Sequence, residues 1–336
     1  MPRRIPLNDL LRHNLLLHDE LANSARRVIE RGWYILGSEG AEFESAFASY
    51  CGVPHAVGMA NGTDAIELAL RAVGIGVGHS VATVANAGFY ASTSVRAIGA
   101  QPVYVDVVPE TYSMSIESLR RELARNSVHA VIATHLYGRL ADIETITAIC
   151  RPLGIPVIED CAQAHGATRN GRAAGSFGIA GCFSFYPTKN LGALGDGGAV
   201  TTSDVAIAER LRELRQYGWD KKYQVSRAGG RNSRLDELQA AFLLAKLPHL
   251  DRWNEARREI ARRYSKRSGI HVSNFPEISG QIMSPTSSWF VARIATASAG
   301  IWRRMELPRI SIIRYPIISS PPMLFPTSPG YGKPNF

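Results

Sequence analysis

The run Phe183–Gly192 carries one lysine, Lys189, at the end of an apolar, strand-like segment and just before a glycine-rich loop, 192–198. Aromatic side chains and glycine backbone remove water from a neighbouring ammonium group, which favours the neutral amine. A neutral, positioned amine is what Schiff-base chemistry requires. Because a lysine at a strand end more often lies in solvent, the catalytic interpretation depends on the other motifs.

The residues Asn61-Gly62-Thr63-Asp64 join a short apolar strand to a helix. Glycine lets backbone amides approach an anion, and the N-terminus of a helix adds a favourable dipole. The Thr63 hydroxyl can donate to the same anion. Gly62 and Thr63 are therefore candidates for a phosphate site, and a capped helix start without a ligand is the alternative.

Acidic residues end another apolar strand, in the run Val157–Gly166. A buried carboxylate is costly unless it is paired. Asp160 can pair with the protonated ring nitrogen of pyridoxal phosphate (PLP). An acidic N-cap is the simpler alternative for this residue.

Strand patterns alternate with helical patterns along most of the chain. The expected strands are 56–60, 81–85, 102–106, 128–134, 155–159, 180–185 and 198–203. The expected helices are 8–32, 42–47, 65–73, 90–98, 115–124, 142–151, 205–215 and 235–265. This alternation predicts an α/β fold with a mainly parallel sheet and helices on both faces. Sites in such sheets collect at the carboxyl ends of the strands, where Gly62, Asp160 and Lys189 fall.

Composition narrows the class of protein. The chain has 336 residues, a formal charge of +9 and four cysteines without paired close spacing. We find no apolar stretch long enough to cross a membrane, no signal peptide and no nucleic-acid motif. The cysteine spacing argues against a zinc site or a disulfide framework. These features predict a cytoplasmic protein with no membrane or nucleic-acid partner.

In chain order the motifs supply a phosphate cradle, a carboxylate for a ring nitrogen and a Schiff-base lysine. Together they resemble the DegT/DnrJ/EryC1/StrS family of PLP-dependent sugar aminotransferases over roughly residues 5–265. The resemblance implies the fold-type I, aspartate aminotransferase-like architecture. We expect a large PLP-binding domain over 1–245, with an N-terminal helical arm, and a small C-terminal domain over 246–336.

The resemblance also implies a role for each candidate residue. Lys189 would form the Schiff base and shuttle a proton, and Asp160 would keep the pyridine nitrogen protonated. The further cofactor contacts that it implies are Gln163 at the phenolic oxygen, Gly62, Thr63 and Ser184 at the phosphate, Tyr90 (or Phe89) on the ring face, and Asn232 at the phosphate of the partner's site. Two half-sites that complete each other imply a homodimer.

A finer resemblance concerns the substrate. Tyr217-Gly218-Trp219 with Lys222-Tyr223 is similar to members that aminate the 3-keto group of dTDP-linked 6-deoxysugars. The implied reaction passes an amino group from L-glutamate to PLP and then to a nucleotide-linked keto-sugar. A variable surface loop is the alternative for these residues.

Three other functions are open to such a chain. A PLP-dependent or pyridoxamine phosphate-dependent sugar dehydratase of the same family carries histidine in place of the lysine, so Lys189 argues against it. The intact Asp160 and Lys189 argue against a catalytically impaired regulatory relative, whereas the altered C-terminal segment argues for it. A nicotinamide dehydrogenase would need a Gly-x-Gly-x-x-Gly fingerprint after the first strand, which the chain lacks.

The C-terminal segment departs from the family pattern. The runs 288–293 and 313–317 look like degraded forms of two family landmarks, with arginine where histidine is expected, and prolines crowd the end. We hypothesise a frameshifted or truncated C-terminus and an incomplete small domain. Ordinary divergence of a variable domain is the alternative.

Overall fold

The computed structural model describes residues 9–125 and 128–267. The helices are α1 (Leu10–Leu15), α2 (His18–Arg31), α3 (Ser38–Cys51), α4 (Gly62–Ala72), α5 (Tyr90–Ala97), α6 (Ile116–Arg125), α7 (Ile143–Cys150), α8 (Val205–Leu214), α9 (Glu237–Lys246) and α10 (Leu250–Arg267), with short 3-10 turns η1 (Leu136–Gly138), η2 (Arg151–Leu153) and η3 (Leu247–His249). The strands are β1 (His55–Met59), β2 (Ser80–Val84), β3 (Gln101–Val105), β4 (Ala130–Thr134), β5 (Val157–Asp160), β6 (Thr168–Arg169), β7 (Arg172–Ala173), β8 (Ala180–Ser184), β9 (Gly198–Thr202), β10 (Trp219–Lys221) and β11 (Gln224–Val225).

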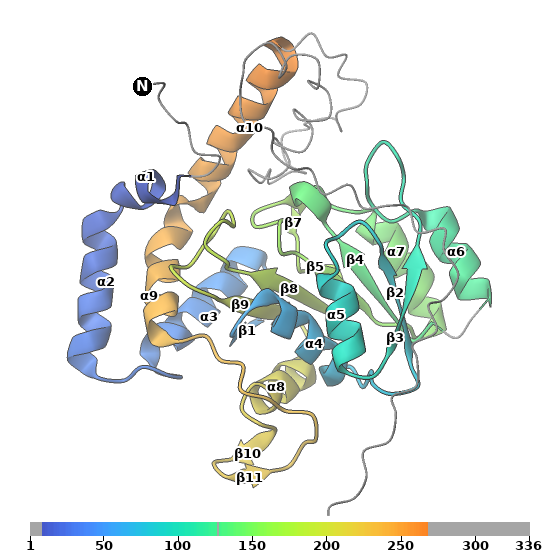
Figure 1. The fold of residues 1–336 in the computed structure, drawn as a ribbon, viewed down its shortest axis with the longest axis horizontal. Coiled ribbons are helices and arrows are strands. Elements are labelled where there is room, and N and C mark those ends of the chain that lie inside the picture. The colour runs from blue at the N-terminus through green and yellow to red at the C-terminus, as the bar shows by residue number, and fades with distance from the viewer. Residues whose placement is uncertain (1–8, 126–127, 268–336) are drawn as a thin grey trace, which may run out of the picture. The chain divides into compact units, whose positions relative to one another are not determined.

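A seven-stranded sheet in the order β1-β9-β8-β5-β4-β2-β3 forms the centre of the fold (Figure 1). The pairs β2–β3, β2–β4, β4–β5 and β5–β8 are parallel, and β9 runs antiparallel to β1 and β8. The carboxyl ends of β1, β4, β5 and β8 therefore meet at one edge, where β9 begins. The predicted mainly parallel sheet is confirmed.

Both faces of the sheet are buried, because successive side chains of a strand point to opposite faces. In β4, Val131 and Ala133 belong to the apolar cluster that α3, α6, α7 and α9 complete. Ala130 and Ile132 belong to the second cluster, which α4, α5 and α8 complete. This explains why the strands are continuous apolar runs and confirms helices on both faces.

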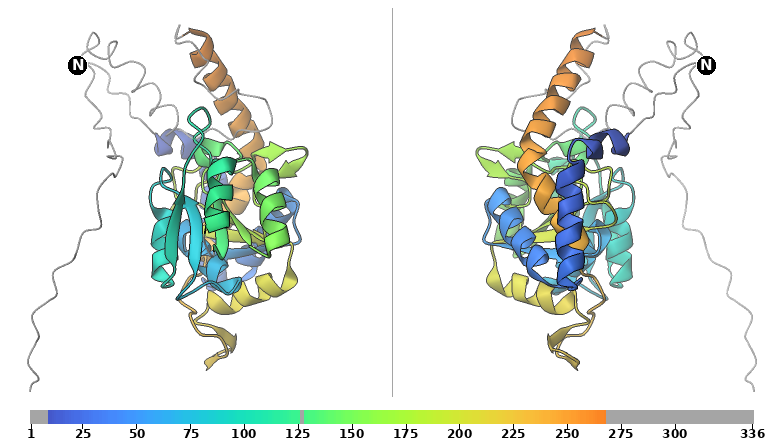
Figure 2. Two further views of the ribbon diagram at one scale, coloured as in Figure 1. Left: turned by 90° about the vertical axis from the view of Figure 1, so that its right-hand side faces the viewer. Right: turned by 90° about the vertical axis from the view of Figure 1, so that its left-hand side faces the viewer.

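The expected helix 8–32 is two helices. Asp9 caps α1, and the chain leaves helical geometry at Leu17 before α2 begins. The reason is packing: Leu17 turns into a small apolar cluster with Leu21, Phe242 and Trp253. As a result α2 runs beside α9, which the right-hand view of Figure 2 shows.

The expected helix 235–265 is also interrupted. Pro248, which has no backbone N–H, lies in the 3-10 turn η3 between α9 and α10. The described residues contain no helix that is both long and apolar enough to cross a membrane. The predicted boundary at residues 245 and 246 stays a prediction, and the altered landmarks at 288–293 and 313–317 lie outside the described residues.

Candidate active site

The start of α4 and the end of β8 meet at the carboxyl edge of the sheet. A Cβ on Gly62 would lie 2.6 Å from the Cβ of Ser184 and 3.2 Å from its Oγ, so only glycine permits this approach. Asn61 caps α4 through a 2.8 Å hydrogen bond from the Asp64 N–H to its Oδ1. The helix N-terminus and the Ser184 hydroxyl are thus neighbours, which suits an anion such as phosphate.

The helix α5 adds aromatic residues to the same corner. Ser94 Oγ lies 2.9 Å from the Thr63 carbonyl oxygen and 3.1 Å from that of Tyr90, so it joins the first turns of α4 and α5. The ring-stacking candidates are both exposed, Tyr90 by 62% and Phe89 by 47%. Both side chains are therefore accessible to a ligand.

Asp160 ends β5 with its side chain buried. Its Oδ1 accepts from the Ala162 N–H at 3.1 Å, and its Oδ2 accepts from Thr134 Oγ1 at 3.4 Å. Burial raises the pKa of this carboxyl group, while the Ala162 N–H and the charge of Lys189 oppose the rise. Thr134 is a residue that sequence reasoning missed, although a polar side chain at the end of a strand pattern is a signal for it.

The charge of Lys189 interacts with that of Asp160. Burial lowers the pKa of its amine, and the Asp160 charge opposes that change. The amine therefore gives up its proton more readily than a solvent-exposed lysine does, as the sequence predicted.

The loop that carries Lys189 is held in place from α9 and α10. The Lys246 ammonium donates to the Gly192 carbonyl at 2.8 Å, and Asn190 Nδ2 donates to Asn254 Oδ1 at 2.7 Å. Asn254 in turn donates to the His165 carbonyl at 2.8 Å. Sequence reasoning missed Lys246 and Asn254, because nothing local links two helical residues to a distant loop.

A hydrogen bond from the backbone fixes the orientation of the Gln163 side-chain amide. The Tyr137 N–H donates to Gln163 Oε1 at 2.6 Å, and a backbone N–H can only donate. The carbonyl oxygen is thus engaged, which leaves the NH₂ group of Gln163 as its donor to other groups. Tyr137 was also missed, since the sequence carries no signal for this contact.

Asn232 belongs to the loop that precedes α9. It is exposed and forms a backbone bridge to Gln216. The next residue, Ser233, is buried and accepts from the Ala60 N–H at 3.1 Å. The loop thus passes just before the start of α4, and the role of Asn232 in a partner's site stays a prediction.

The groups at this edge fit PLP. A helix N-terminus with a close glycine and a hydroxyl suits its phosphate, and a buried carboxylate beside an easily neutralised lysine suits its ring and aldehyde. This fit follows from the residues of this chain alone and does not depend on similarity to another protein.

Comparisons with known proteins agree with this chemistry. Residues 16–307 match the DegT/DnrJ/EryC1/StrS aminotransferase family. A dTDP-3-amino-3,6-dideoxy-alpha-D-galactopyranose transaminase from Aneurinibacillus thermoaerophilus is 44% identical over 317 residues, which are 93% of this chain and 85% of that protein. The match passes residue 265, so family sequence extends further than the motifs had suggested.

Solved structures share the fold. The crystal structure of DesV from S. venezuelae in complex with a ketimine intermediate has a TM-score of 0.76 and 40% identity, covering 84% of this chain and 75% of that one. The structure of NtdA from Bacillus subtilis with bound cofactor PMP has a TM-score of 0.77 and 26% identity, covering 88% and 70%. The fold, the site chemistry and these matches lead to one conclusion: the chain belongs to the DegT/DnrJ/EryC1/StrS family of PLP-dependent aminotransferases.

Proposed function

We propose that this protein transfers an amino group from L-glutamate to a nucleotide-linked keto-6-deoxysugar, with dTDP-linked 3-keto sugars as the preferred class. The observation that carries the chemistry is the half-buried Lys189, whose charge interacts with that of the buried Asp160 at the carboxyl edge of the sheet. The sugar class is supported by the name of the Aneurinibacillus thermoaerophilus relative, which acts on a dTDP-linked 3-amino sugar. The four cysteines are free and buried, which suits the proposed cytoplasmic location.

Bound PLP supplies an electron sink that stabilises the charge left when a proton leaves the amino donor. The Asp160 carboxylate holds the proton on the ring nitrogen, which maintains that sink. Lys189 Nζ would hold the cofactor at its aldehyde carbon; once free, its neutral amine would take the proton from the donor and give it back as the ammonium. Burial lowers the pKa of Lys189 and so favours this role.

The remaining candidates orient the cofactor. Gly62, Thr63 and Ser184 bind its phosphate through backbone N–H groups and hydroxyls. Gln163 donates its NH₂ group to the phenolic oxygen, because Tyr137 occupies its carbonyl oxygen. Tyr90 covers the ring, and Asn232 reaches the phosphate of the partner subunit.

A homodimer follows from this arrangement, because Asn232 of each chain completes the other site. Exposed aromatic residues are candidates for its interface, because aromatic side chains are enriched at interfaces between proteins. They are Trp33, Tyr34, Phe89, Tyr90, Tyr186, Tyr217 and Tyr223.

The test is the visible absorption spectrum of the protein with added PLP, before and after excess L-glutamate, for the wild type and for Lys189→Ala. We expect a band in the wild type that shifts with glutamate and is absent from the variant. A wild-type band that ignores glutamate would contradict the donor, and the absence of a lysine-dependent band would contradict the function. Incubation of the amine form with dTDP-linked or UDP-linked keto-sugars, followed by mass spectrometry, then identifies the acceptor.

A further inference from the structure

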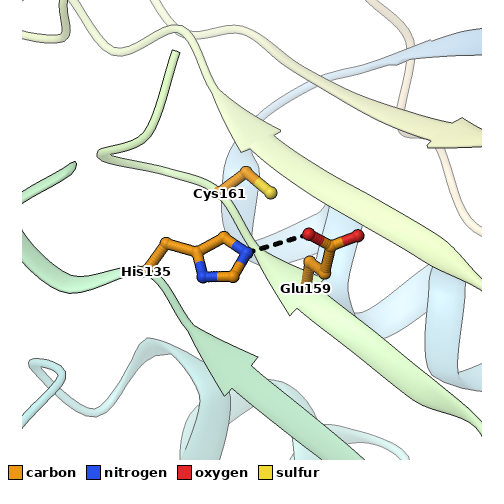
Figure 3. A group of neighbouring side chains, drawn as sticks. All are labelled: His135, Glu159 and Cys161. Atoms are coloured by element: carbon orange, nitrogen blue, oxygen red, sulfur yellow. Dashed lines mark hydrogen bonds and ion pairs between the residues drawn. The ribbon is translucent and has the colours of Figure 1, made fainter. Parts of the chain in front are cut away.

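A fully buried group of side chains lies next to Asp160, at the ends of β4 and β5. His135 follows β4, and Glu159 lies in β5; the two are joined by a 2.9 Å hydrogen bond between His135 Nε2 and Glu159 Oε2 (Figure 3). Cys161 completes the group. The proposed roles of Lys189 and Asp160 do not use any of these three side chains.

The protonation of His135 follows from its neighbours. The Ala141 N–H donates to His135 Nδ1 at 3.1 Å, so Nδ1 carries no proton. The proton of the neutral ring therefore lies on Nε2 and is donated to Glu159. Glu159 accepts three more hydrogen bonds, from the backbone N–H groups of Gly175 at 3.0 Å, Phe177 at 2.8 Å and Gly178 at 2.8 Å.

These contacts argue against a metal ion, although three ligand-type atoms lie within 4.8 Å of one another. Both ring nitrogens of His135 and both oxygens of Glu159 already have hydrogen-bond partners. Burial, with further contributions from nearby carboxylates, raises the pKa of the Cys161 thiol and disfavours the thiolate that a metal needs. The group is thus built for hydrogen bonding.

The pair acts on Asp160 through the backbone. Glu159 and Asp160 are adjacent in β5, so their side chains point to opposite faces of the sheet. In addition, the backbone N–H of His135 donates to the Asp160 carbonyl at 3.0 Å. The Glu159 carboxylate ties β5 to the turn 175–178 that leads into β8. Any release of Glu159 therefore moves the strand end that aims Asp160.

The pair also acts on Gln163. Between His135 and Ala141 the chain makes a tight turn in which Tyr137 has a φ of 61°, a strained value for a tyrosine. The hydrogen bond from the Ala141 N–H to His135 Nδ1 closes this turn. The same turn presents the Tyr137 N–H that orients Gln163.

We propose that His135 and Glu159 form a buried positioning pair that aims Asp160 and Gln163 at the cofactor ring. The proposal rests on the proposed function of those two residues. Through Nε2 the pair controls the end of β5, and through Nδ1 it controls the turn that orients the Gln163 amide.

Two substitutions at His135 separate the pair's contacts. His135→Asn keeps an acceptor near the Ala141 N–H and removes the donor to Glu159. His135→Gln keeps a donor that reaches Glu159. The control is Thr202→Val, which removes the hydrogen bond of another buried side chain, to the Ile179 carbonyl at 2.7 Å, at the opposite end of the strands. The readouts are the PLP dissociation constant and the pH midpoint of the lysine-dependent absorption band.

We expect His135→Asn to weaken PLP binding about tenfold and to shift the pH midpoint, because Glu159 loses a donor in the interior. His135→Gln should return PLP binding to within about threefold of the wild type. Thr202→Val should lower the unfolding temperature and leave both readouts unchanged. Wild-type values for a folded His135→Asn variant would overturn the proposal, as would a His135→Gln variant no better than His135→Asn.

If neither variant folds, histidine-labelled wild-type protein decides the question by nuclear magnetic resonance. We expect a neutral His135 with its proton on Nε2 and a resonance that moves when PLP binds; an unmoved resonance would overturn the pair. A wild type without a lysine-dependent band would overturn the proposed function and the pair together. A normal wild-type band with an unaffected His135→Asn variant would overturn the pair alone.

Discussion

The central relation at the scale of residues is between Asp160 and Lys189. Burial raises the pKa of the acid and lowers that of the amine, while each charge opposes the shift of the other. Burial would by itself neutralise both groups, and their proximity limits this. The same two groups can therefore keep a ring nitrogen protonated and exchange a proton with a substrate carbon.

Replacing Asp160 tests this relation. Asp160→Asn keeps the size of the side chain and removes its charge, so we expect the glutamate half-reaction to slow by about 10²-fold or more. Stopped-flow absorbance measures that rate. Asp19→Asn, at an exposed carboxylate, is the control and should react like the wild type. An Asp160→Asn enzyme with the wild-type rate would exclude the carboxylate as the partner of the ring nitrogen.

The lowered pKa of a second residue, Lys246, makes the stability of the fold depend on pH. Burial lowers its pKa from 10.5 to about 8 in the folded state. Between these values the unfolded chain binds more protons than the folded protein, so the contribution of Lys246 to stability rises with pH. We expect the unfolding free energy of the wild type relative to Lys246→Met to grow between pH 8 and 10.5, by at most about 1.4 kcal/mol for each pH unit.

Urea unfolding of the two proteins across this pH range gives the difference directly. A constant difference would mean that Lys246 keeps an ordinary pKa in the folded state. The hydrogen bond to Gly192 persists with a neutral amine, so its loss in the variant adds an offset that does not depend on pH.

At the scale of elements, the site depends on how closely α4 approaches β8. The contact is possible because Gly62 has no side chain, and α4 then presents its N-terminus beside the Ser184 hydroxyl. The loop between β8 and β9 is held by α9 and α10 in addition to its own backbone hydrogen bonds. Four elements from distant parts of the chain, α4, β8, α9 and α10, therefore form the proposed cofactor site.

Gly62→Ala tests the approach of α4. The new methyl group would overlap Ser184 and push the helix N-terminus away, so we expect PLP affinity to fall by about tenfold. Gly76→Ala is the matched control, because its Cβ meets the nearest atom at 3.9 Å. Titration of each apoprotein with PLP, followed by absorbance, supplies the two constants. Equal constants for the two variants would remove Gly62 from the phosphate site.

At the scale of the whole molecule, one proposed cofactor contact, that of Asn232, belongs to the site of a second copy of the chain. Asn232 is exposed, while its neighbour Ser233 is anchored beside Ala60. The loop is thus held firmly and directs Asn232 outward. This arrangement suits a residue that serves a second copy of the chain.

Subunit mixing tests the shared site. Lys189→Ala and Asn232→Asp should each be nearly inactive, the second because its carboxylate repels phosphate. If Asn232 acts in the partner's site, each mixed dimer has one intact site, so an equal mixture should recover about a quarter of the wild-type activity. If Asn232 acts within its own chain, the mixture stays inactive. Light scattering during size-exclusion chromatography checks that the species is a dimer.

The sequence by itself determined the elements and the chemical groups of this protein. Apolar runs and helical periodicity predicted each strand of the main sheet to within a few residues, because these patterns reflect local burial. The misjudged helices, 8–32 and 235–265, are interrupted at Leu17 and Pro248. The break at Leu17 depends on packing against Trp253, whereas Pro248 was visible in the sequence.

Only the tertiary structure decided which side chains meet. Thr134 beside Asp160, Tyr137 beside Gln163 and Lys246 beside Gly192 are contacts between residues far apart in the chain. Such contacts follow from the order of strands in the sheet and from the faces on which the helices pack, and a local pattern encodes neither. The sequence thus proposed the lysine and the carboxylate, and the fold placed hydrogen bonds around Asp160, Gln163 and the loop that carries Lys189.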